Sequence, residues 1–476
     1  MPSSWVLSLA PGVSVSSDDD DLLFRLPFGE MAMRQPIAAV RDALRRLAPP
    51  GDAEDRLAES VLTAAGSDAL ARWYYALGRL AGRGLLQIAV HADQGPLATL
   101  LPISRSFTFT GVAIPRRPCR LSRFAYLHRN GEEMVLESPL AFARVALHDD
   151  RTAALVHALA RPAAARELSG RVAGLDAEVA AKLLGLFAVA GMVVEVGDDG
   201  KAAEDDNPAL QCWEFHDLLF HSRSRVGRHD APVGGTYRHA GRLEPPPPLK
   251  PAASTETVEL YRPDLESLGR DDPPFARVLE ERRSIREYAA LPITDRQLGE
   301  FLFRAARVKG RRSWEVPAPD GPIRVESTTR PYPAGGGLYE LEVYAVVNAC
   351  ENLPPGLYHY DPAGHRLERL AGRNAEVRAL LSDAAQSAGA AADGLQVVLI
   401  LASRFPRLAW KYASLAYALT LKHVGVVYQT MYLAATAMGL APCALGGGDS
   451  DLFARAAGVD YYAETSVGEF LLGSRR

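Results

Sequence analysis

The chain has 476 residues, a formal net charge of -4 at neutral pH, and 48% hydrophobic and 23% charged residues. This length predicts two or more domains with complete cores, and the slightly acidic balance argues against a general nucleic-acid binder. The four cysteines, Cys119, Cys212, Cys350 and Cys443, form no C-x-x-C pair, which predicts a reducing cytosol and neither a disulfide framework nor a zinc site.

The apolar segments predict neither a targeting signal nor a membrane span. Residues 1–5 lack a basic stretch followed by an apolar one, so we expect no signal peptide. The longest apolar run, residues 395–402, is too short to cross a bilayer. We therefore expect a cytoplasmic protein.

The first half of the chain shows one order of elements twice. In residues 1–100, apolar periodicity predicts strands at 6–9, 13–15, 22–26 and 85–91 and helices at 36–47, 53–65 and 68–81. In residues 101–230, the segment 133–139 resembles 21–27, and it precedes predicted helices at 151–159, 163–172 and 176–190 and a strand at 191–196. We expect two winged-helix-like units in tandem, at 1–100 and 101–230.

The role of these two units stays open between two alternatives. Winged helices often bind DNA, but the helices here are rich in alanine and poor in basic residues. A structural or dimerising module and a peptide-binding module fit equally well, and a peptide would add to an exposed sheet edge. His216 and His221 are five residues apart, unlike helical metal ligands, so no metal site is predicted.

A segment rich in glycine and proline separates the two halves. Residues 231–258 include four consecutive prolines at 245–248. Such a run favours an extended polyproline conformation that acts as a stiff spacer. We predict a linker here and a second domain at 259–476.

The second half alternates helices and strands. Helices are predicted at 274–282, from Thr294 to about residue 308, and at 414–438, with Thr294 and Gln297 forming a capping box. Strands are predicted at 339–347, 357–361, 395–402 and 467–473, and the polar stretch 309–327 is predicted to be a surface loop.

Two glycine-rich bends and one arginine run are the candidate binding elements. Prolines and glycines at 331–337 alternately fix and free the backbone, which suits close approach of amides to a flat or anionic ligand. A second bend lies at 444–449. Three arginines around Ser284 at 282–286 would give a multi-donor phosphate pocket. The alternatives are a tight turn before a strand and a solvated charge cluster.

These pieces, in this order, resemble the nitroreductase-like flavoenzymes and, more narrowly, the SagB-type (McbC-like) azoline dehydrogenases. The matching pieces are Arg-Arg-Ser-x-Arg at 282–286, Pro-x-Gly-Gly-Gly at 333–337, Leu-Tyr-His-Tyr at 357–360, Lys-Tyr at 411–412, the helix end at 432–440 and the closing Gly473. The resemblance implies an α+β protein, with a C-terminal mixed, largely antiparallel sheet packed by helices and preceded by the tandem winged-helix-like units.

The resemblance also implies a function. It implies an FMN-dependent homodimer, with each flavin at the subunit interface, that oxidises thiazoline or oxazoline rings in a ribosomally made precursor peptide. The front half would resemble the peptide-recognition modules that accompany some of these enzymes. Two alternatives remain: another flavin oxidoreductase that acts on a small molecule with NAD(P)H, and a non-catalytic scaffold that holds a cyclodehydratase partner and the precursor peptide together.

Site residues follow from the resemblance by position. The flavin phosphate and ribityl chain would be held by Arg282, Ser284 and Arg286, with Arg283 beside them and Arg475 near the chain end. The isoalloxazine would be approached by Pro333, Ala334, Gly335 and Gly336, with Gly446 and Gly447 near the flavin N5 edge. Many relatives have serine at the position of Ala334, so a side-chain hydroxyl contact there is lost.

Lys411 and Tyr412 match the catalytic pair of the family. Aromatising an azoline removes two hydrogens, one as hydride to the flavin and the other as a proton to a base. Either side chain could be that base. The chain lacks the G-x-G-x-x-G fingerprint of nicotinamide-binding domains, so we expect oxygen to reoxidise the flavin.

Overall fold

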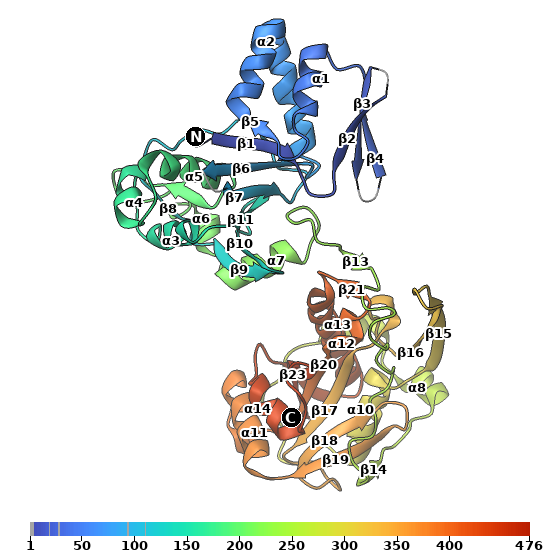
Figure 1. Ribbon diagram of the computed structural model, residues 1–476. Coiled ribbons are helices and arrows are strands. Elements are labelled where there is room, and N and C mark those ends of the chain that lie inside the picture. Colours follow the sequence, from blue (N-terminus) through green and yellow to red (C-terminus); the bar gives the residue numbers. More distant parts are fainter. Residues whose placement is uncertain (1–3, 19, 27–28, 93–94, 110) are drawn as a thin grey trace. The chain divides into compact units, whose positions relative to one another are not determined.

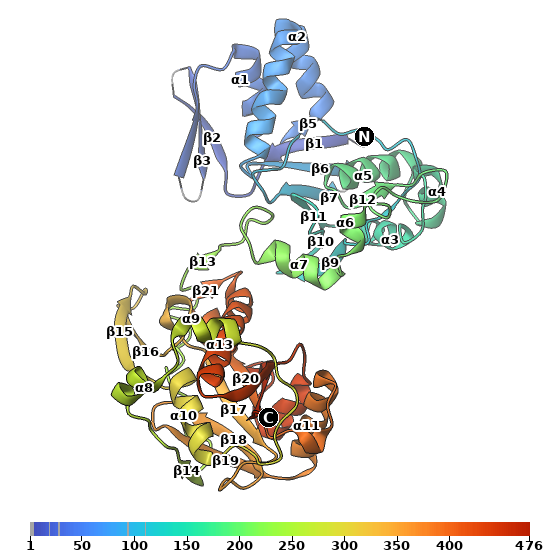
Figure 2. The same cartoon turned by 180° about the vertical axis from the view of Figure 1, so that it is seen from behind.

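The computed structural model describes residues 4–18, 20–26, 29–92, 95–109 and 111–476 (Figures 1 and 2). It divides into two compact units, Met1–Ala231 and Pro232–Arg476. Residue Pro27, at the end of the first copy of the predicted repeat, lies outside the described residues. Across the described ranges, every helix is too short or too polar to cross a bilayer.

The N-terminal unit is built around one seven-stranded sheet in the order β5-β1-β6-β7-β11-β10-β9, with separate sheets β2-β3-β4 and β8-β12. Its strands are β1 (Ser4–Leu9), β2 (Ser14–Asp18), β3 (Asp21–Leu26), β4 (Gly29–Met33), β5 (Asp52–Ala53), β6 (Leu86–Ala92), β7 (Gly95–Pro102), β8 (Cys119–Leu121), β9 (Tyr126–Asn130), β10 (Glu133–Glu137), β11 (Ala143–Leu147) and β12 (Val193–Glu195). Its helices are α1 (Ala38–Arg45), α2 (Glu54–Ala81), α3 (Asp150–Ala158), α4 (Ala165–Arg171), α5 (Ala177–Val189), α6 (Pro208–Gln211) and α7 (Phe215–Arg223).

The two halves predicted for this unit share one sheet and one core. The predicted division at 100 and 101 falls inside β7, which pairs with β6 on one side and β11 on the other. A single apolar cluster runs from Leu7 to Val193. The helices predicted at 53–65 and 68–81 form α2, in which Gly66 has the non-helical angles φ 78° and ψ -173°.

The C-terminal unit is built around a seven-stranded sheet in the order β14-β19-β18-β17-β20-β23-β22. Its strands are β13 (Gly234–Gly235), β14 (Thr257–Glu259), β15 (Gly310–Val316), β16 (Ile323–Thr329), β17 (Leu341–Val347), β18 (Gly356–Asp361), β19 (Arg366–Gly372), β20 (Val397–Arg404), β21 (Tyr412–Ala413), β22 (Leu440–Ala444) and β23 (Glu464–Ser474). Its helices are α8 (Leu265–Asp271), α9 (Phe275–Glu281), α10 (Asp295–Ala306), α11 (Ala375–Ala388), α12 (Phe405–Ala409), α13 (Ala416–Ala437) and α14 (Ser450–Ala457), with short 3-10 turns η1 (Gly335–Gly337) and η2 (Ala392–Gly394).

Both faces of this sheet are covered by helices (Figures 1 and 2). Strand side chains alternate between faces. In β17, Val343 and Ala345 pack in the cluster that contains α10 and α13, whereas Tyr344 and Val346 pack in the cluster that contains α11. Because both faces are buried, β17 is apolar at nearly every position, as expected for a central strand. Each neighbouring pair in the sheet is antiparallel.

The loop predicted at 309–327 is wrong. Residues Gly310–Val316 and Ile323–Thr329 form an antiparallel hairpin, β15–β16. The prolines and the glycine lie in the turn at 317–322 between the strands. The strands were missed because most of their side chains are polar, so the apolar alternation that marks a half-buried strand is weak.

The predicted linker is held against the C-terminal unit from Pro232 onward. We call residues 232–250 the strap. Arg404 and Arg407 donate to the carbonyl oxygens of Pro247 and Pro246, and the Trp410 indole N–H donates to the carbonyl of Leu243 at 2.7 Å. Proline carbonyls still accept hydrogen bonds, so buried donors fix the strap, which therefore does not act as a free spacer.

A buried charge cluster lies within the same unit. Both ring nitrogens of His359 face carboxylates, Nε2 that of Glu342 at 3.2 Å and Nδ1 that of Glu368 at 3.1 Å, and all three side chains are at most 2% exposed. Burial alone would lower the pKa of His359, but its bonds to the two carboxylates outweigh burial and raise it. Burial alone would raise the pKa of Glu342, but its bond to His359 and nearby positive charges lower it to about 2.

We expect this cluster to stabilise the fold most between pH 4.5 and 6.5, the ordinary pKa values of Glu and His. The Glu342 contribution is present above 4.5 and is lost as pH falls toward 2, whereas the His359 contribution is present below 6.5 and is lost as pH rises through its raised pKa. His359→Gln should lower the free energy of unfolding at pH 6 by about 3 kcal/mol, because it removes the cation that contacts Glu368 and leaves Arg404 as the cation that contacts Glu342. Denaturant titrations at pH 6 and 9 measure the free energy of unfolding of the wild type and of His359→Gln. The exposed His216→Gln serves as control, and equal stability of His359→Gln and wild type at pH 6 would contradict it.

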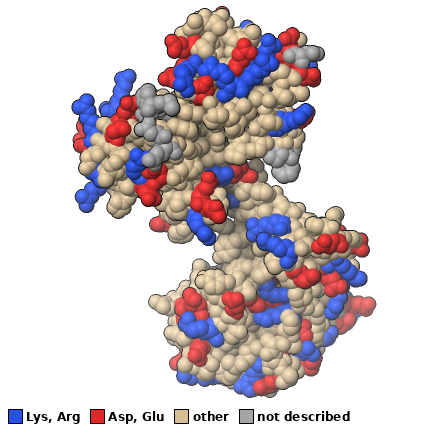
Figure 3. Space-filling model, viewed as in Figure 1, with Lys and Arg blue, Asp and Glu red and all other residues tan. Residues whose placement is uncertain are grey.

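On the face shown in Figure 3, basic and acidic side chains are interspersed on both units. In the N-terminal unit, Arg45 lies 3.5 Å from Asp42, and Arg46 and Arg56 both contact Asp52. These arginines are thus partly neutralised by aspartates.

Candidate active site

Lys411 and Tyr412 converge on the glycine bend. They follow α12, and the short strand β21 that Tyr412 begins pairs with β13 of the strap. A Cβ added to Gly336 would lie 2.5 Å from Lys411 Nζ and 2.6 Å from the Tyr412 hydroxyl oxygen. Gly336 has φ 60°, a conformation that favours glycine. The polar atoms of the predicted catalytic pair therefore converge on one exposed residue, Gly336, of the predicted flavin-facing bend.

The other side of the bend is held by a histidine that sequence reasoning missed. The Gly335 N–H donates to His423 Nε2 at 2.7 Å, and His423 Nδ1 lies 2.7 Å from the wholly buried Glu340. Because Nε2 accepts, Nδ1 carries the proton and donates to Glu340. A lone histidine in the apolar helix α13 forms no motif, so nothing in the pattern marked it.

The arginine run is organised by a second residue of α13, Tyr432. Its hydroxyl lies 2.7 Å from Ser284 Oγ and accepts from the Ala444 N–H at 2.8 Å. The Arg282 guanidinium carbon lies 5.2 Å from the centroid of the Tyr432 ring, within cation–π range. Tyr432 belongs to the helix-end piece of the family resemblance, but no role was predicted for it.

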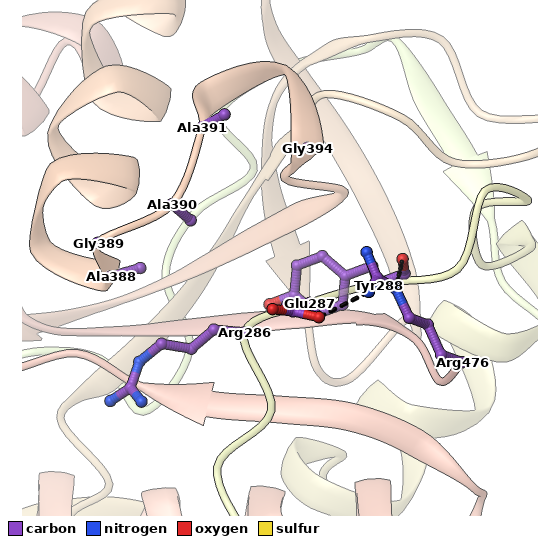
Figure 4. Close-up of a pocket in the computed structure, with 9 residues that line it drawn as sticks. All are labelled: Arg286, Glu287, Tyr288, Ala388, Gly389, Ala390, Ala391, Gly394 and Arg476. Atoms are coloured by element: carbon purple, nitrogen blue, oxygen red, sulfur yellow. Dashed lines mark hydrogen bonds and ion pairs between the residues drawn. The ribbon is translucent and has the colours of Figure 1, made fainter.

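The other arginines of the run point to two places. Arg286 lines a cavity of about 470 Å³ with Tyr288 and Arg476, and its side chain extends away from the ion pair of Glu287 and Arg476 (Figure 4). The pKa of Glu281 is lowered by a hydrogen bond from Arg277 and, at longer range, by the charges of Arg475 and Arg283. Arg475 and Arg283 thus both act on Glu281, and the cavity holds Arg476, which was not predicted.

The second glycine bend is anchored by a neighbour of the predicted residues. Gly446 and Gly447 are exposed, and a Cβ added to either would meet no atom within 4 Å. A Cβ on Gly448 would instead lie 2.4 Å from a carboxylate oxygen of Glu469, a buried acid of β23 whose pKa is raised by burial. Glu469 thus packs closely against Gly448, and Gly446 and Gly447 present open backbone.

These residues fit a flavin mononucleotide. In the described part of the chain, the guanidinium groups of Arg282, Arg283 and Arg286 form no ion pair within 4.0 Å, so their charge is available to a phosphate. The glycine bend offers backbone that lacks side chains. His423 and Tyr432, which hold the bend and the run, are nine residues apart on α13, about 13 Å along the helix axis.

Among the described residues, no group of three or more His, Cys, Asp or Glu side chains could hold a metal ion.

Three family models match successive parts of the chain. The "ThcOx helix turn helix domain" matches residues 1–110, the "Cyanobactin oxidase ThcOx" model residues 119–230, and the "Nitroreductase family" model residues 279–473. The first two fall on the two halves of the N-terminal unit. The third covers the arginine run, both glycine bends and the Lys411–Tyr412 pair.

Two curated relatives match part of the chain. "Putative nitroreductase MJ1384" of Methanocaldococcus jannaschii is 30% identical over 191 residues, which are 40% of this chain and 85% of that protein. The microcin B17-processing protein McbC of Escherichia coli is 32% identical over 120 residues, which are 24% of this chain and 43% of that protein. One chain of the solved Escherichia coli microcin synthetase McbBCD complex is 18% identical to this chain, with a TM-score of 0.35. The match spans 55% of this chain and 92% of the chain from the complex.

Proposed function

The chain belongs to the nitroreductase family, in its SagB-type (McbC-like) branch, and on this premise we propose that it is an FMN-dependent oxidoreductase that oxidises thiazoline or oxazoline rings of a ribosomally made peptide to thiazoles or oxazoles. The similarity to a microcin-processing protein and to a cyanobactin oxidase model supports a peptide substrate. The observation that carries the proposal is the convergence of Lys411 Nζ and the Tyr412 hydroxyl on Gly336.

In this proposal, each group of residues has one task. Arg282, Ser284 and Arg286 would bind the FMN phosphate, and Pro333 to Gly336, with Gly446 and Gly447, would flank the flavin ring. When bound, FMN supplies a two-electron acceptor for the hydride equivalent of ring oxidation. Either Lys411 Nζ or the Tyr412 oxygen, in its deprotonated form, would accept the proton that leaves the azoline carbon, since both atoms are within reach of the same exposed backbone.

We further propose that the enzyme is a homodimer that works with a cyclodehydratase partner. Phe275 and Leu279 of α9 and Leu421 of α13 are apolar and exposed. Exposed apolar side chains on neighbouring helices favour association with a second protein surface. A second copy of the chain would cover them, and the cyclodehydratase would supply the azoline rings that this chain consumes.

Mass spectrometry of the product tests the function. Peptides that carry azolines, incubated with the yellow, FMN-loaded protein, should lose two hydrogen atoms for each ring. Peptides that lack the rings should stay unchanged. An unchanged azoline peptide in the presence of bound FMN and oxygen would favour a small-molecule reductase or a scaffold instead.

Arg286→Ala should weaken FMN binding by roughly 10- to 100-fold, because a charge-assisted hydrogen bond contributes about 1.5–3 kcal/mol. Quenching of flavin fluorescence on binding measures the dissociation constant. Arg373→Ala, an exposed arginine outside the run, is the matched control. An unchanged dissociation constant in Arg286→Ala would remove Arg286 from the phosphate site.

A further inference from the structure

The ammonium group of Lys411 lies among three aromatic rings. Its Nζ is 5.3 Å from the ring centroid of Tyr237, 5.2 Å from that of Trp314 and 5.3 Å from that of Tyr412. Within the described residues, no carboxylate lies within 4.0 Å of it. Lys411 is half-buried, so water solvates its charge only in part.

The two rings beyond the pair come from segments far away in sequence. Tyr237 belongs to the strap, and its N–H donates to the Lys411 carbonyl at 3.0 Å. Trp314 lies on β15, in the hairpin that the sequence did not predict. Tyr237 also packs edge to face on Trp410, with ring centroids 5.8 Å apart. The strap and the hairpin therefore reach the same lysine from two directions.

One buried side chain joins these segments to the glycine bend. Arg407 is 2% exposed, and its guanidinium donates to the carbonyl of Pro246 in the strap, of Glu326 in β16 at 2.8 Å, and of Leu338 at 3.0 Å. Strap, hairpin and bend thus share one anchor. The rings that flank Lys411 are held by backbone contacts that do not involve the Lys411 side chain.

We propose that Tyr237 and Trp314 are positioning residues that, with Tyr412, enclose the Lys411 ammonium and hold it over Gly336. The faces of aromatic rings attract a cation and do not attract a neutral amine. The enclosure holds the Lys411 ammonium beside the Tyr412 hydroxyl, and it restricts a side chain that would otherwise have four rotatable bonds. This proposal deepens the proposed function and rests on it for its catalytic consequence only.

The enclosure can be tested without turnover. Reductive methylation with isotope-labelled formaldehyde converts lysines of the full-length protein to dimethyl-lysines, which keep their charge. Aromatic cages bind methylated ammonium groups, so the Lys411 methyl resonance should be displaced by ring currents from the ordinary lysine position. Lys411→Arg identifies the signal by its loss.

Variants of the two rings give the decisive comparison. Trp314→Leu and Tyr237→Leu should each move the Lys411 resonance toward the ordinary lysine position, whereas Trp314→Phe should retain most of the displacement. Ser313→Ala, the exposed neighbour on the opposite face of β15, should leave it unchanged. An ordinary position for Lys411 in the wild type, or an unmoved resonance in both leucine variants, would overturn the proposal.

Turnover gives a second readout. In the FMN-loaded enzyme, Trp314→Leu should lower kcat about tenfold, and Trp314→Phe should recover most of it. The methyl resonance is read without substrate, so failure of azoline oxidation and failure of the enclosure are distinguishable. A displaced resonance with no oxidation would contradict the proposed function alone.

Discussion

Lys411→Ala and Tyr412→Phe are each expected to lower azoline turnover by at least about 100-fold while the purified protein stays yellow. Positioned acid–base groups contribute about 10²–10⁴-fold to a rate. Both polar atoms lie at Gly336, and neither belongs to the arginine run around Ser284. Removing them therefore affects proton transfer more than binding of the FMN phosphate.

Single-turnover rates and flavin content measure the two effects separately. The matched control is Lys422→Ala, which removes an exposed lysine of α13. Near-normal rates in both Lys411→Ala and Tyr412→Phe would exclude the pair from the mechanism. A colourless Lys411→Ala protein would show that this lysine contributes to flavin binding.

Gly336→Ala is expected to abolish most turnover, whereas Gly337→Ala should not. Both glycines have positive φ, 60° and 70°, so alanine costs each variant a similar amount, about 1–2 kcal/mol of stability. Their surroundings differ. A Cβ on Gly336 would lie within 2.6 Å of Lys411 Nζ and Tyr412 Oη, whereas a Cβ on Gly337 would meet only Ser327 Oγ at 3.5 Å.

The comparison thus separates backbone strain from displacement of the catalytic pair. We expect similar shifts of the unfolding midpoint in the two variants and a difference of at least tenfold in turnover. Equal turnover would mean that the contact of Gly336 with the pair does not matter for catalysis. Far lower stability of Gly336→Ala alone would mean that Lys411 and Tyr412 cannot move away from the added methyl group.

The sequence predicted well those elements whose side chains are governed by local rules. Thr294 and Gln297 form the predicted capping box of α10, with both reciprocal bonds present. The central strand β17 and the long helix α13 lie where their apolar patterns indicate. β17 is buried at every position, which leaves a continuous apolar run, and α13 is buried along part of its surface, so both leave a clear apolar pattern in the sequence.

What the sequence did not predict depends on contacts between distant segments. The strap was taken for a spacer because its prolines indicate an extended backbone but not the donors, Arg404 and Arg407, that bind it. His423 and Tyr432 act through single hydrogen bonds to Gly335 and Ser284, which no spacing encodes. The hairpin that carries Trp314 is mostly polar, so its periodic signal is weak.

The roles given to the site residues remain proposals that variants must test. The structure brings Lys411, Tyr412 and the first glycine bend together, and it brings Arg282 and Ser284 together at Tyr432. Arg475 and Arg283 both act on Glu281, while the cavity beside Arg286 holds Arg476. Arg476→Ala and Arg475→Ala are therefore useful companions to Arg286→Ala in flavin titrations.

The most direct measurement is an anaerobic titration of the FMN-loaded protein, followed by flavin absorbance. We expect an azoline-containing peptide to bleach the flavin, one flavin for each ring converted, and NADPH to leave it oxidised. Bleaching by NADPH with no response to the azoline peptide would contradict this expectation, and so would a protein that stays colourless in excess FMN.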